Sequence, residues 1–458
     1  MTLPLWTQTL AVACLALALG TGAHAQSRED SGSVRLSVAG KLRLEAEVLN
    51  RLACEAVSRD GAARAEAFAA LAETDAQIAR FLAALKDGNL ALGIRQPEAK
   101  RRVTDQLFAV STAWRPVSAA ASAIAAGDAT VARLGEVLAA SAEAEQAIQD
   151  LLAVLAGSYS SSETFSFQAS LALNVLVREK VILAEIATLQ CLIEADMPNI
   201  SDAAALALDR EVETFEASLQ ALITGQPGIG LMEPPNAAVK NKLLEIAVLW
   251  SAVSPNMVDG VSLAEEPELM RELDNAEILY LLATSAQPDL YRIPLEQYAS
   301  EELRTWIRDP LVTQSIALQN VAHFALDQDA VDAMDQTWRA ERASGDHRVI
   351  AEMMARPLSE RLKDRQDQTA GIVTEVFVMD NKGLNVGQSA ITSDLWQGDE
   401  DKWQLTYADP DGDMHISEVE FDESTGFFQV QVSLPVSDPA SGDRIGAVTF
   451  GVNIQSLL

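Results

Sequence analysis

An internal duplication is the feature that most constrains what this chain can fold into. When the sequence is laid on itself at a constant offset, residues of the same type coincide along the copies. The pairs include Val38 with Val175, Leu52 with Leu189, Cys54 with Cys191, Leu82 with Leu219, Gly88 with Gly225 and Pro97 with Pro234. After a slip of one residue the match continues, and Trp114 pairs with Trp250. Such a repeat predicts two copies of one structural unit that bury apolar faces against their neighbours.

Apolar spacing within each copy predicts helices. The steps of four and three join Val103, Leu107, Val110, Trp114 and Val117 in the first copy, and Val239, Leu243, Ile246, Trp250 and Val253 in the second. This spacing places all members of a set on one helix face. Gly-rich, Pro-ended connectors at 88–97 and 225–235 separate the helices within each copy. We therefore predict two antiparallel four-helix bundles, at residues 33–158 and 165–288, with both tryptophans in the cores.

The pattern changes to helices followed by strands from about residue 297. Strand-like runs lie at 373–379, 384–388, 415–421, 427–434 and 445–454, and turn sequences such as Asp380 to Gly383 and Asp438 to Gly442 separate them. This order predicts an α+β domain with a five-stranded antiparallel sheet over residues 297–458.

The first 25 residues have the pattern of a secretory signal peptide. An apolar run from Leu10 to Leu19 is followed by Ala23-His24-Ala25, so we expect the mature chain to begin near Gln26 and to lie in the periplasm. No later run approaches the roughly 18 apolar residues of a membrane helix, so no membrane insertion is expected. The net charge of −32 repels nucleic acid and anionic lipid, which disfavours both as partners.

The opening of the first copy, Ser37 to Leu44, reads SVAGKLRL. It resembles the start of the PilJ-type, methyl-accepting chemotaxis N-terminal domain of bacterial sensors, and the matching residues are Ala39, Gly40 and Arg43. The Met-Leu-Ser-Gln-Arg run that follows in the family is replaced here by residues 44–48. The resemblance covers residues 33–288 and implies helical domains of signal transduction.

The C-terminal part resembles a Cache-type extracellular sensor domain, which has a PAS-like fold. The segments that carry the resemblance are 374–380, 383–388, 392–400 and 438–446. It spans residues 297–458 and implies a ligand-binding fold, not an enzyme. Members of both families usually adjoin a transmembrane helix and a cytoplasmic module, whereas this sequence stops after its last strand. We therefore expect a membrane-bound chemoreceptor or sensor kinase as the partner that reads the signal.

The segment 393–407 borders the ligand pocket in the resembling fold. Its candidate ligand-binding residues are Asp394, Trp396, Asp399, Trp403 and Tyr407. Aromatic faces beside carboxylates suit an amine-bearing or amino-acid-like ligand, through cation–π contacts and charge-assisted hydrogen bonds. The alternative is that both tryptophans hold a long loop on the sheet.

Cys54 and Cys191 are the cysteines that remain after signal removal, and they occupy the same place in the two copies. An even pair in an oxidising compartment favours a disulfide. The alternative is two buried thiols inherited by duplication. The distance between the Cα atoms decides between them, because a disulfide needs it to be within about 7 Å.

Catalytic motifs are missing from the sequence, which has no GxSxG, HExxH, P-loop or CxxC pattern. The acidic run from Asp409 to Glu420 has calcium-loop spacing, but Met414 stands where glycine is required, so we expect a turn and no metal. We expect no cofactor and no enzymatic activity. The favoured interpretation is a periplasmic solute sensor, and the alternative is an envelope scaffold or interaction protein without a ligand.

Overall fold

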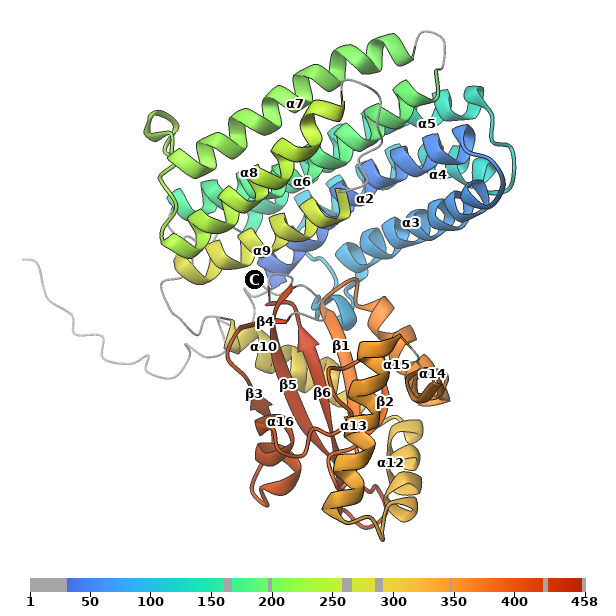
Figure 1. The fold of residues 1–458 in the computed structure, drawn as a ribbon. Coiled ribbons are helices and arrows are strands. Elements are labelled where there is room, and N and C mark those ends of the chain that lie inside the picture. The colour runs from blue at the N-terminus through green and yellow to red at the C-terminus, as the bar shows by residue number, and fades with distance from the viewer. Residues whose placement is uncertain are drawn as a thin grey trace, which may run out of the picture.

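The structure is a computed structural model, and it describes residues 31–159, 167–196, 200–257, 266–284, 291–345, 348–422 and 427–454. The expected signal peptide lies outside the described residues. Figure 1 shows two layers of long helices above a C-terminal domain that contains a sheet. The predicted fold class, helical bundles followed by an α+β domain with an antiparallel sheet, is confirmed.

The first copy is a four-helix bundle. Its helices are α2 (Ser31–Ser58), α3 (Gly61–Asp87), α4 (Arg101–Ala125) and α5 (Val131–Tyr159). The apolar face of α4 is buried from Val103 to Val117, as the spacing predicts. Trp114 is 4% exposed, and its Nε1 donates to Asp75 Oδ1 at 3.2 Å. The ring therefore packs in the core while its N–H keeps a hydrogen-bond partner.

The second copy repeats this arrangement. Its helices are α6 (Phe167–Glu194), α7 (Ser201–Thr224), α8 (Ala237–Met257) and α9 (Glu266–Thr284). Trp250 is also 4% exposed, it packs on Phe215 with ring centroids 4.2 Å apart, and its Nε1 donates to Glu216 Oε1 at 3.1 Å. Both tryptophans thus have the core position that the repeat predicts.

The connectors between the second and third helices are also alike. Each contains a short 3-10 turn, η1 (Leu90–Leu92) or η2 (Pro227–Ile229), enclosed by one antiparallel bridge. Gly93 and Gly230 follow these turns with φ of 70° and 88°, a left-handed conformation that favours glycine. The duplication therefore extends to the backbone of a loop.

The C-terminal domain begins with helices. They are α10 (Arg292–Tyr298), the π-helical turn η3 (Ala299–Leu303), α11 (Arg304–Trp306), α12 (Pro310–Ala322), α13 (Gln328–Ser344), α14 (Arg348–Met354) and α15 (Pro357–Gln368). The sheet follows, with β1 (Val373–Met379), β2 (Asn385–Gln388), β3 (His415–Ile416), β4 (Glu420–Asp422), β5 (Phe427–Ser437) and β6 (Arg444–Val452). The short helix α16 (Asp401–Trp403) and the π-helical turn η4 (Gln404–Ala408) lie between β2 and β3.

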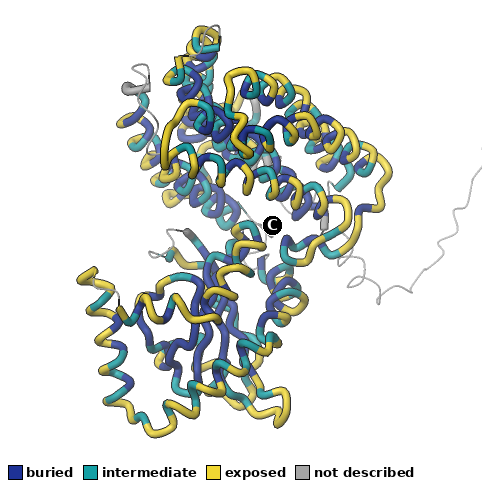
Figure 2. The backbone as a smooth tube through the Cα atoms, turned by 90° about the vertical axis from the view of Figure 1, so that its right-hand side faces the viewer, coloured by how far each residue is buried: buried dark blue, intermediate teal, exposed yellow. Residues whose placement is uncertain are grey.

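All strand pairs are antiparallel, in the order β2-β1-β6-β5-β3, and β4 pairs with β5. One face of the sheet is apolar and packs on the helices from α10 to α12 and on α15. In Figure 2 the strands form the most continuously buried part of this domain, and its helices expose their outer faces. The opposite face is covered in part, because Trp403 and Tyr407 pack on Phe377, Met379 and Ala447.

The sheet has six strands and not the predicted five, because the run 415–421 divides into β3 and β4. Ser417 causes the break: its backbone N donates to Gln431 O, and its Oγ accepts from Gln431 N at 2.9 Å. A side-chain oxygen therefore takes the place of a backbone carbonyl in the ladder, which interrupts regular pairing.

Candidate ligand-binding site

A cavity of about 300 Å³ lies on the polar face of the sheet. Its lining comes from α13, β1, the connection between β2 and β3, and the β3–β5 segment: Arg342, Glu375, Phe377, Thr392, Ser393, Gln397, Lys402, Ser417, Glu420, Phe421, Asp422, Gln429 and Gln431. This volume is at the lower end of the range of about 300–1,000 Å³ for small-molecule sites. The cavity therefore suits a small, polar metabolite.

Strand alternation explains why this face is polar. On β1, Val376 and Val378 lie in the apolar core, so Glu375 and Phe377 face the other way. On β5, Val430 and Val432 are in the same core, which turns their polar neighbours Gln429 and Gln431 toward the cavity. The two strands thus place acidic and amide side chains on one surface.

Glu375 is the most deeply buried charged group of the cavity, with 5% of its surface exposed. Its Oε1 accepts from Gln429 Nε2 at 2.8 Å and from Gln431 Nε2 at 3.4 Å. Gln429 Nε2 also donates to Asp422 Oδ2 at 2.5 Å. Burial, followed by the charge of Asp422, raises the pKa of Glu375. A cation in the cavity would relieve both effects.

Two basic side chains line the same cavity. Lys402 Nζ pairs with Glu400 Oε2 at 2.8 Å, donates to Gln397 Oε1 at 3.1 Å and lies 5.3 Å from the centroid of the Phe377 ring. Arg342 of α13 is exposed. The site therefore offers a carboxylate cluster together with cationic groups, an arrangement that suits a ligand with a positive group and a second polar or anionic group.

None of the five predicted ligand-binding residues is on the lining of this cavity, although three of its lining residues, Ser393, Gln397 and Lys402, come from the same segment. Trp396 Nε1 donates to Lys382 O at 2.8 Å, and Trp403 Nε1 donates to Asp380 O at 3.1 Å. Both indoles therefore hold the loop on the β1–β2 turn, which is the alternative interpretation of these tryptophans.

The remaining three candidates have other surroundings. Asp394 is 8% exposed, accepts from Arg339 Nη2 at 2.8 Å and thereby ties the loop to α13. Asp399 is exposed. Tyr407 packs on Trp403 with ring centroids 5.0 Å apart, and burial raises its pKa. Direct ligand contact by any of the five stays a prediction.

A close backbone approach fixes the same loop. A Cβ atom on Gly383 would lie 2.4 Å from Gly398 Cα, and Gly383 has φ of +82°. Only glycine combines this conformation with this proximity. The loop segment that carries Gln397 and Lys402 is thus held against the β1–β2 turn.

The cavity strands also contact the helical bundles. Phe428 is next to Gln429, and its backbone N donates to Asn275 Oδ1 of α9 at 3.4 Å. Lys41 Nζ of α2 donates to Ala370 O, just before β1, at 2.9 Å. Strands β1 and β5 therefore each begin near a contact with a bundle helix.

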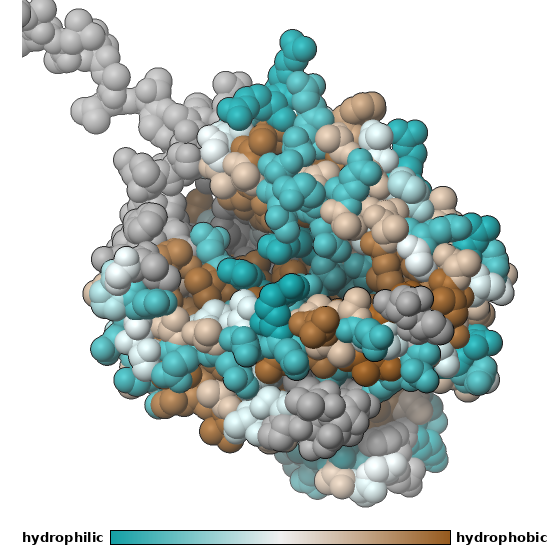
Figure 3. Space-filling model, turned by 90° about the horizontal axis from the view of Figure 1, so that it is seen from above, coloured by the Kyte–Doolittle hydropathy of each residue, from teal (hydrophilic) through white to brown (hydrophobic). Residues whose placement is uncertain are grey.

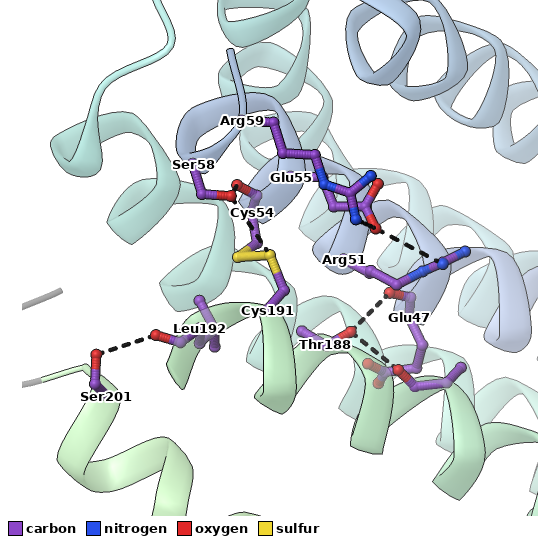
Figure 4. The surroundings of a disulfide bond; sticks show 11 residues. Glu47, Arg51, Cys54, Glu55, Ser58, Arg59, Thr188, Cys191, Leu192 and Ser201 are labelled. Atoms are coloured by element: carbon purple, nitrogen blue, oxygen red, sulfur yellow. Dashed lines mark hydrogen bonds and ion pairs between the residues drawn. A yellow bond between two sulfur atoms is a disulfide. The ribbon is translucent and has the colours of Figure 1, made fainter. Parts of the chain in front are cut away.

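Cys54 of α2 and Cys191 of α6 form a disulfide between the two bundles, with Cα atoms 6.2 Å apart. This distance is within the reach required of a disulfide. Figure 4 shows the two side chains pointing toward each other from the neighbouring helices. Thr188 Oγ1 of α6 donates to Glu47 O of α2 at 3.4 Å nearby. The first helices of both copies therefore form the seam between the bundles.

Residues 24–140 match the PilJ family, described as the N-terminal domain of type IV pili methyl-accepting chemotaxis transducers. This segment is therefore similar to a PilJ-type domain. It includes α2 to α4 and the first part of α5, and it indicates a role in signal transduction. No curated protein matches the chain. Among the described residues, no helix has the length and apolar character to cross a membrane.

Sequence reasoning missed the lining from β1, β4, β5 and α13. A period of two was visible in the β5 region, since Gln429, Gln431 and Ser433 alternate with apolar residues. That pattern predicts a polar sheet face. It does not predict that Arg342, on a helix far away in the sequence, reaches the same cavity.

Proposed function

We propose that this protein is a periplasmic sensor that binds a small solute in its C-terminal, Cache-like domain and transmits binding to a membrane-bound chemoreceptor or sensor kinase. The PilJ-type first copy supports the signalling part of this proposal. The signal-peptide pattern and a disulfide, which persists in oxidising compartments, support the periplasmic location. We assign the protein no catalytic reaction.

The observation that carries the proposal is the cavity above the polar face of the sheet, with the buried carboxyl of Glu375 in its wall. A carboxyl in this position loses hydration, and a ligand ammonium group would restore an ionic partner. Arg342 and Lys402 add positive charge elsewhere on the lining. The preferred ligand class is therefore an amine that also has a polar or anionic group, as an amino acid has.

Transmission of binding would use the contacts between this domain and the bundles. A ligand that orders Gln429 acts next to Phe428, whose N–H bonds to Asn275 of α9. Tyr298 Oη of α10 donates to Ala91 O of the first bundle at 3.1 Å, which gives a second contact. Hydrogen bonds therefore connect the C-terminal domain to both copies, directly from the sheet in one case and through α10 in the other.

The experiment is a thermal-shift screen of the full mature chain against amines, amino acids, carboxylates and purines. A ligand at 100 times its dissociation constant adds about 2.7 kcal/mol to the unit that binds it, which gives a measurable shift. We expect a saturable shift with an amine and loss of that shift in Glu375→Gln. Glu360→Gln, the same change at an exposed glutamate of α15 that is not on the cavity lining, is the matched control and should respond as the unmodified chain does.

An absence of shifts across the library, in a folded protein, would contradict solute binding and favour the envelope scaffold. A shift that Glu375→Gln retains would place the ligand elsewhere and remove the proposed role of the cavity. A shift that Glu360→Gln also loses would show that the response does not depend specifically on the buried carboxyl of Glu375.

A further inference from the structure

Three glutamates gather at the seam between the two bundles, and we name them the seam cluster: Glu47 of α2, Glu145 of α5 and Glu185 of α6. Glu47 is 7% exposed, and Thr188 Oγ1 of α6 donates to its backbone O at 3.4 Å. Glu185 precedes Thr188 by one helical turn, so both lie on the side of α6 that faces α2. Figure 4 shows Glu47 and Thr188 at the interface that the disulfide crosses. The cluster therefore lies where the two copies meet.

Hydrogen bonds bring two carboxyls of the seam cluster to one amide. Asn50 Nδ2 donates to Glu47 Oε2 at 3.5 Å and to Glu145 Oε1 at 3.3 Å. Asn50 Oδ1 accepts from Ser141 Oγ at 2.6 Å, which fixes the orientation of the amide. Two carboxyls that share one neutral donor repel each other when both are ionised. The pair therefore holds a proton more firmly than either carboxyl would alone.

The seam cluster has no cation in contact with it. In the part of the chain that the structure describes, none of its three carboxylates forms an ion pair. The same seam contains one elsewhere, since Arg51 Nη1 of α2 pairs with Glu266 Oε2 of α9 at 2.9 Å. Figure 3 shows the outer face of the bundles, where hydrophilic side chains are exposed among apolar ones. Carboxylates on that face are hydrated, whereas the seam cluster has neither full hydration nor a paired cation.

Other charged groups lie farther from the cluster. Arg43 of α2 and Arg210 of α7 act on it at longer range. Arg210 is exposed and pairs with Glu211 Oε1 at 3.0 Å, and Glu211 adds to the negative charge. Arg80 of α3 is near Glu45, which lies on the other side of α2, and the ionisable residues of α4 are all exposed. The packed helices therefore leave an excess of negative charge at the seam.

Burial and this charge favour the protonated form of the cluster. Burial, followed by the charges of Glu145 and Glu185, raises the pKa of Glu47 well above its usual range. Burial, followed by the charge of Glu211, raises the pKa of Glu185 to about 7. The closed seam is therefore most stable at low pH and loses stability as pH rises from 4.5 through about 7. Above that range an opened seam gains the hydration of the ionised carboxylates.

We propose that the seam between the bundles is a pH-responsive joint, which is closed while the seam cluster holds protons and opens to water when its carboxylates ionise. The disulfide between Cys54 and Cys191 does not depend on this protonation, so the copies stay joined in both states. Helix α2 also carries Lys41, whose Nζ donates to Ala370 O just before β1. The joint is thus connected to the strand that lines the cavity, and protons are a second input besides a solute.

Hydrogen exchange of the full mature chain, with its disulfide intact, tests the joint without any solute. The readout is the protection factor of α2 amides around Glu47 at about pH 5 and about pH 8, which corrects for the pH dependence of chemical exchange. Helix α2 is chosen because Glu179, another buried carboxyl, belongs to the second bundle. We expect the parent's protection factor to fall by about tenfold or more over this range, since one pKa unit corresponds to about tenfold.

Glu47→Gln with Glu185→Gln should reduce this fall to less than about threefold, because the amides imitate protonated carboxyls and do not ionise. Glu143→Gln with Glu213→Gln is the matched control, since it removes the same charge from exposed positions of α5 and α7. The control should show the same fall as the parent.

A constant protection factor in the parent, or an equal fall in the variant of Glu47 and Glu185, would overturn the proposal. Loss of the fall in the control would also overturn it, because net charge would then be the cause. If the double variant does not fold, Glu185→Gln alone should still reduce the fall, and retention of the whole fall would contradict the joint. Glu375→Gln should leave the fall unchanged, so failure of the joint and failure of solute binding are distinguishable.

Discussion

Replacing Glu179 of α6 with leucine should stabilise the second bundle at alkaline pH. Glu179 is fully buried, Ser218 Oγ donates to one carboxyl oxygen, and the other oxygen has no hydrogen-bond partner among the described residues. Burial raises its pKa from 4.5 to about 8. The first copy has Leu42 at the equivalent position, also fully buried. Glu179→Leu thus installs the residue that the other copy already uses.

The sign and size of the effect follow from proton linkage. In the parent, the folded state keeps the carboxyl of Glu179 protonated up to a higher pH than the unfolded state does. The contribution of this group to the free energy of unfolding therefore falls as pH rises from 4.5 to about 8, and it stays constant above that pH. Each pKa unit corresponds to about 1.4 kcal/mol, so the difference between variant and parent should grow by about 4 kcal/mol between pH 5 and pH 8.5. Effects of shape and packing do not depend on pH and cancel in this comparison. Ser218 Oγ keeps Thr214 O as an acceptor at 2.7 Å, so the variant creates no orphan hydroxyl.

Pulsed hydrogen exchange of α6 and α9 peptides along a urea series measures the free energy of unfolding of this bundle separately from the rest of the chain. The measurement is made at pH 5 and pH 8.5 on the parent, on Glu179→Leu and on Glu213→Leu, an exposed glutamate of α7. A difference that is the same at both pH values would refute the argument that a buried carboxyl ionises in the folded bundle. Equal pH dependence in the Glu213 variant would refute its assignment to Glu179.

Three further predictions concern the seam and the cavity. Thiol titration of the denatured, unreduced mature chain should find Cys54 and Cys191 oxidised, and two titratable thiols would show that the cysteines are not paired. Replacing both cysteines with serine should lower the free energy of unfolding by roughly 2–5 kcal/mol. Trp403→Phe removes the N–H that donates to Asp380 O and should lower the free energy of unfolding, measured by thermal melting, by about 1 kcal/mol. An unchanged free energy of unfolding would indicate that this hydrogen bond does not hold the loop. Calorimetry should show weaker binding of a cationic solute as pH falls toward the raised pKa of Glu375, because the ionised carboxylate is the binding form; an affinity independent of pH would argue against that role.

The helical part of the fold could be predicted because it depends on local periodicity and on repetition. The steps from Val103 to Val117 define a face that one neighbouring helix can cover, and the same steps recur in the second copy. The strands were also visible, since alternation and turn residues mark them. The division of the third predicted strand into β3 and β4 was not visible in the sequence, because it depends on the Ser417 hydroxyl accepting a hydrogen bond from Gln431 on a neighbouring strand.

The cavity was harder to predict than the fold because its lining depends on which way a long loop turns. The segment 393–407 was expected to border a ligand pocket through its aromatic residues, yet the indoles of Trp396 and Trp403 bond to backbone carbonyls of the β1–β2 turn. The less conspicuous Gln397 and Lys402 reach the cavity instead. Composition identifies the residues with the most binding chemistry, whereas orientation in a loop depends on tertiary hydrogen bonds that have no local pattern.

The duplication produced two similar loops, and the molecule uses them differently. In the first copy, Ala91 O accepts from Tyr298 Oη, and Arg95 Nε pairs with Glu301 Oε2 at 2.8 Å, so the loop holds the C-terminal domain. The equivalent positions of the second copy are Gly228 and Met232, which are exposed. A glycine and a methionine cannot form the ion pair that Arg95 forms. The position of the C-terminal domain therefore depends on residues in which the copies differ and not on the shared helical cores, so a repeated scaffold can hold a single sensor domain at one defined end.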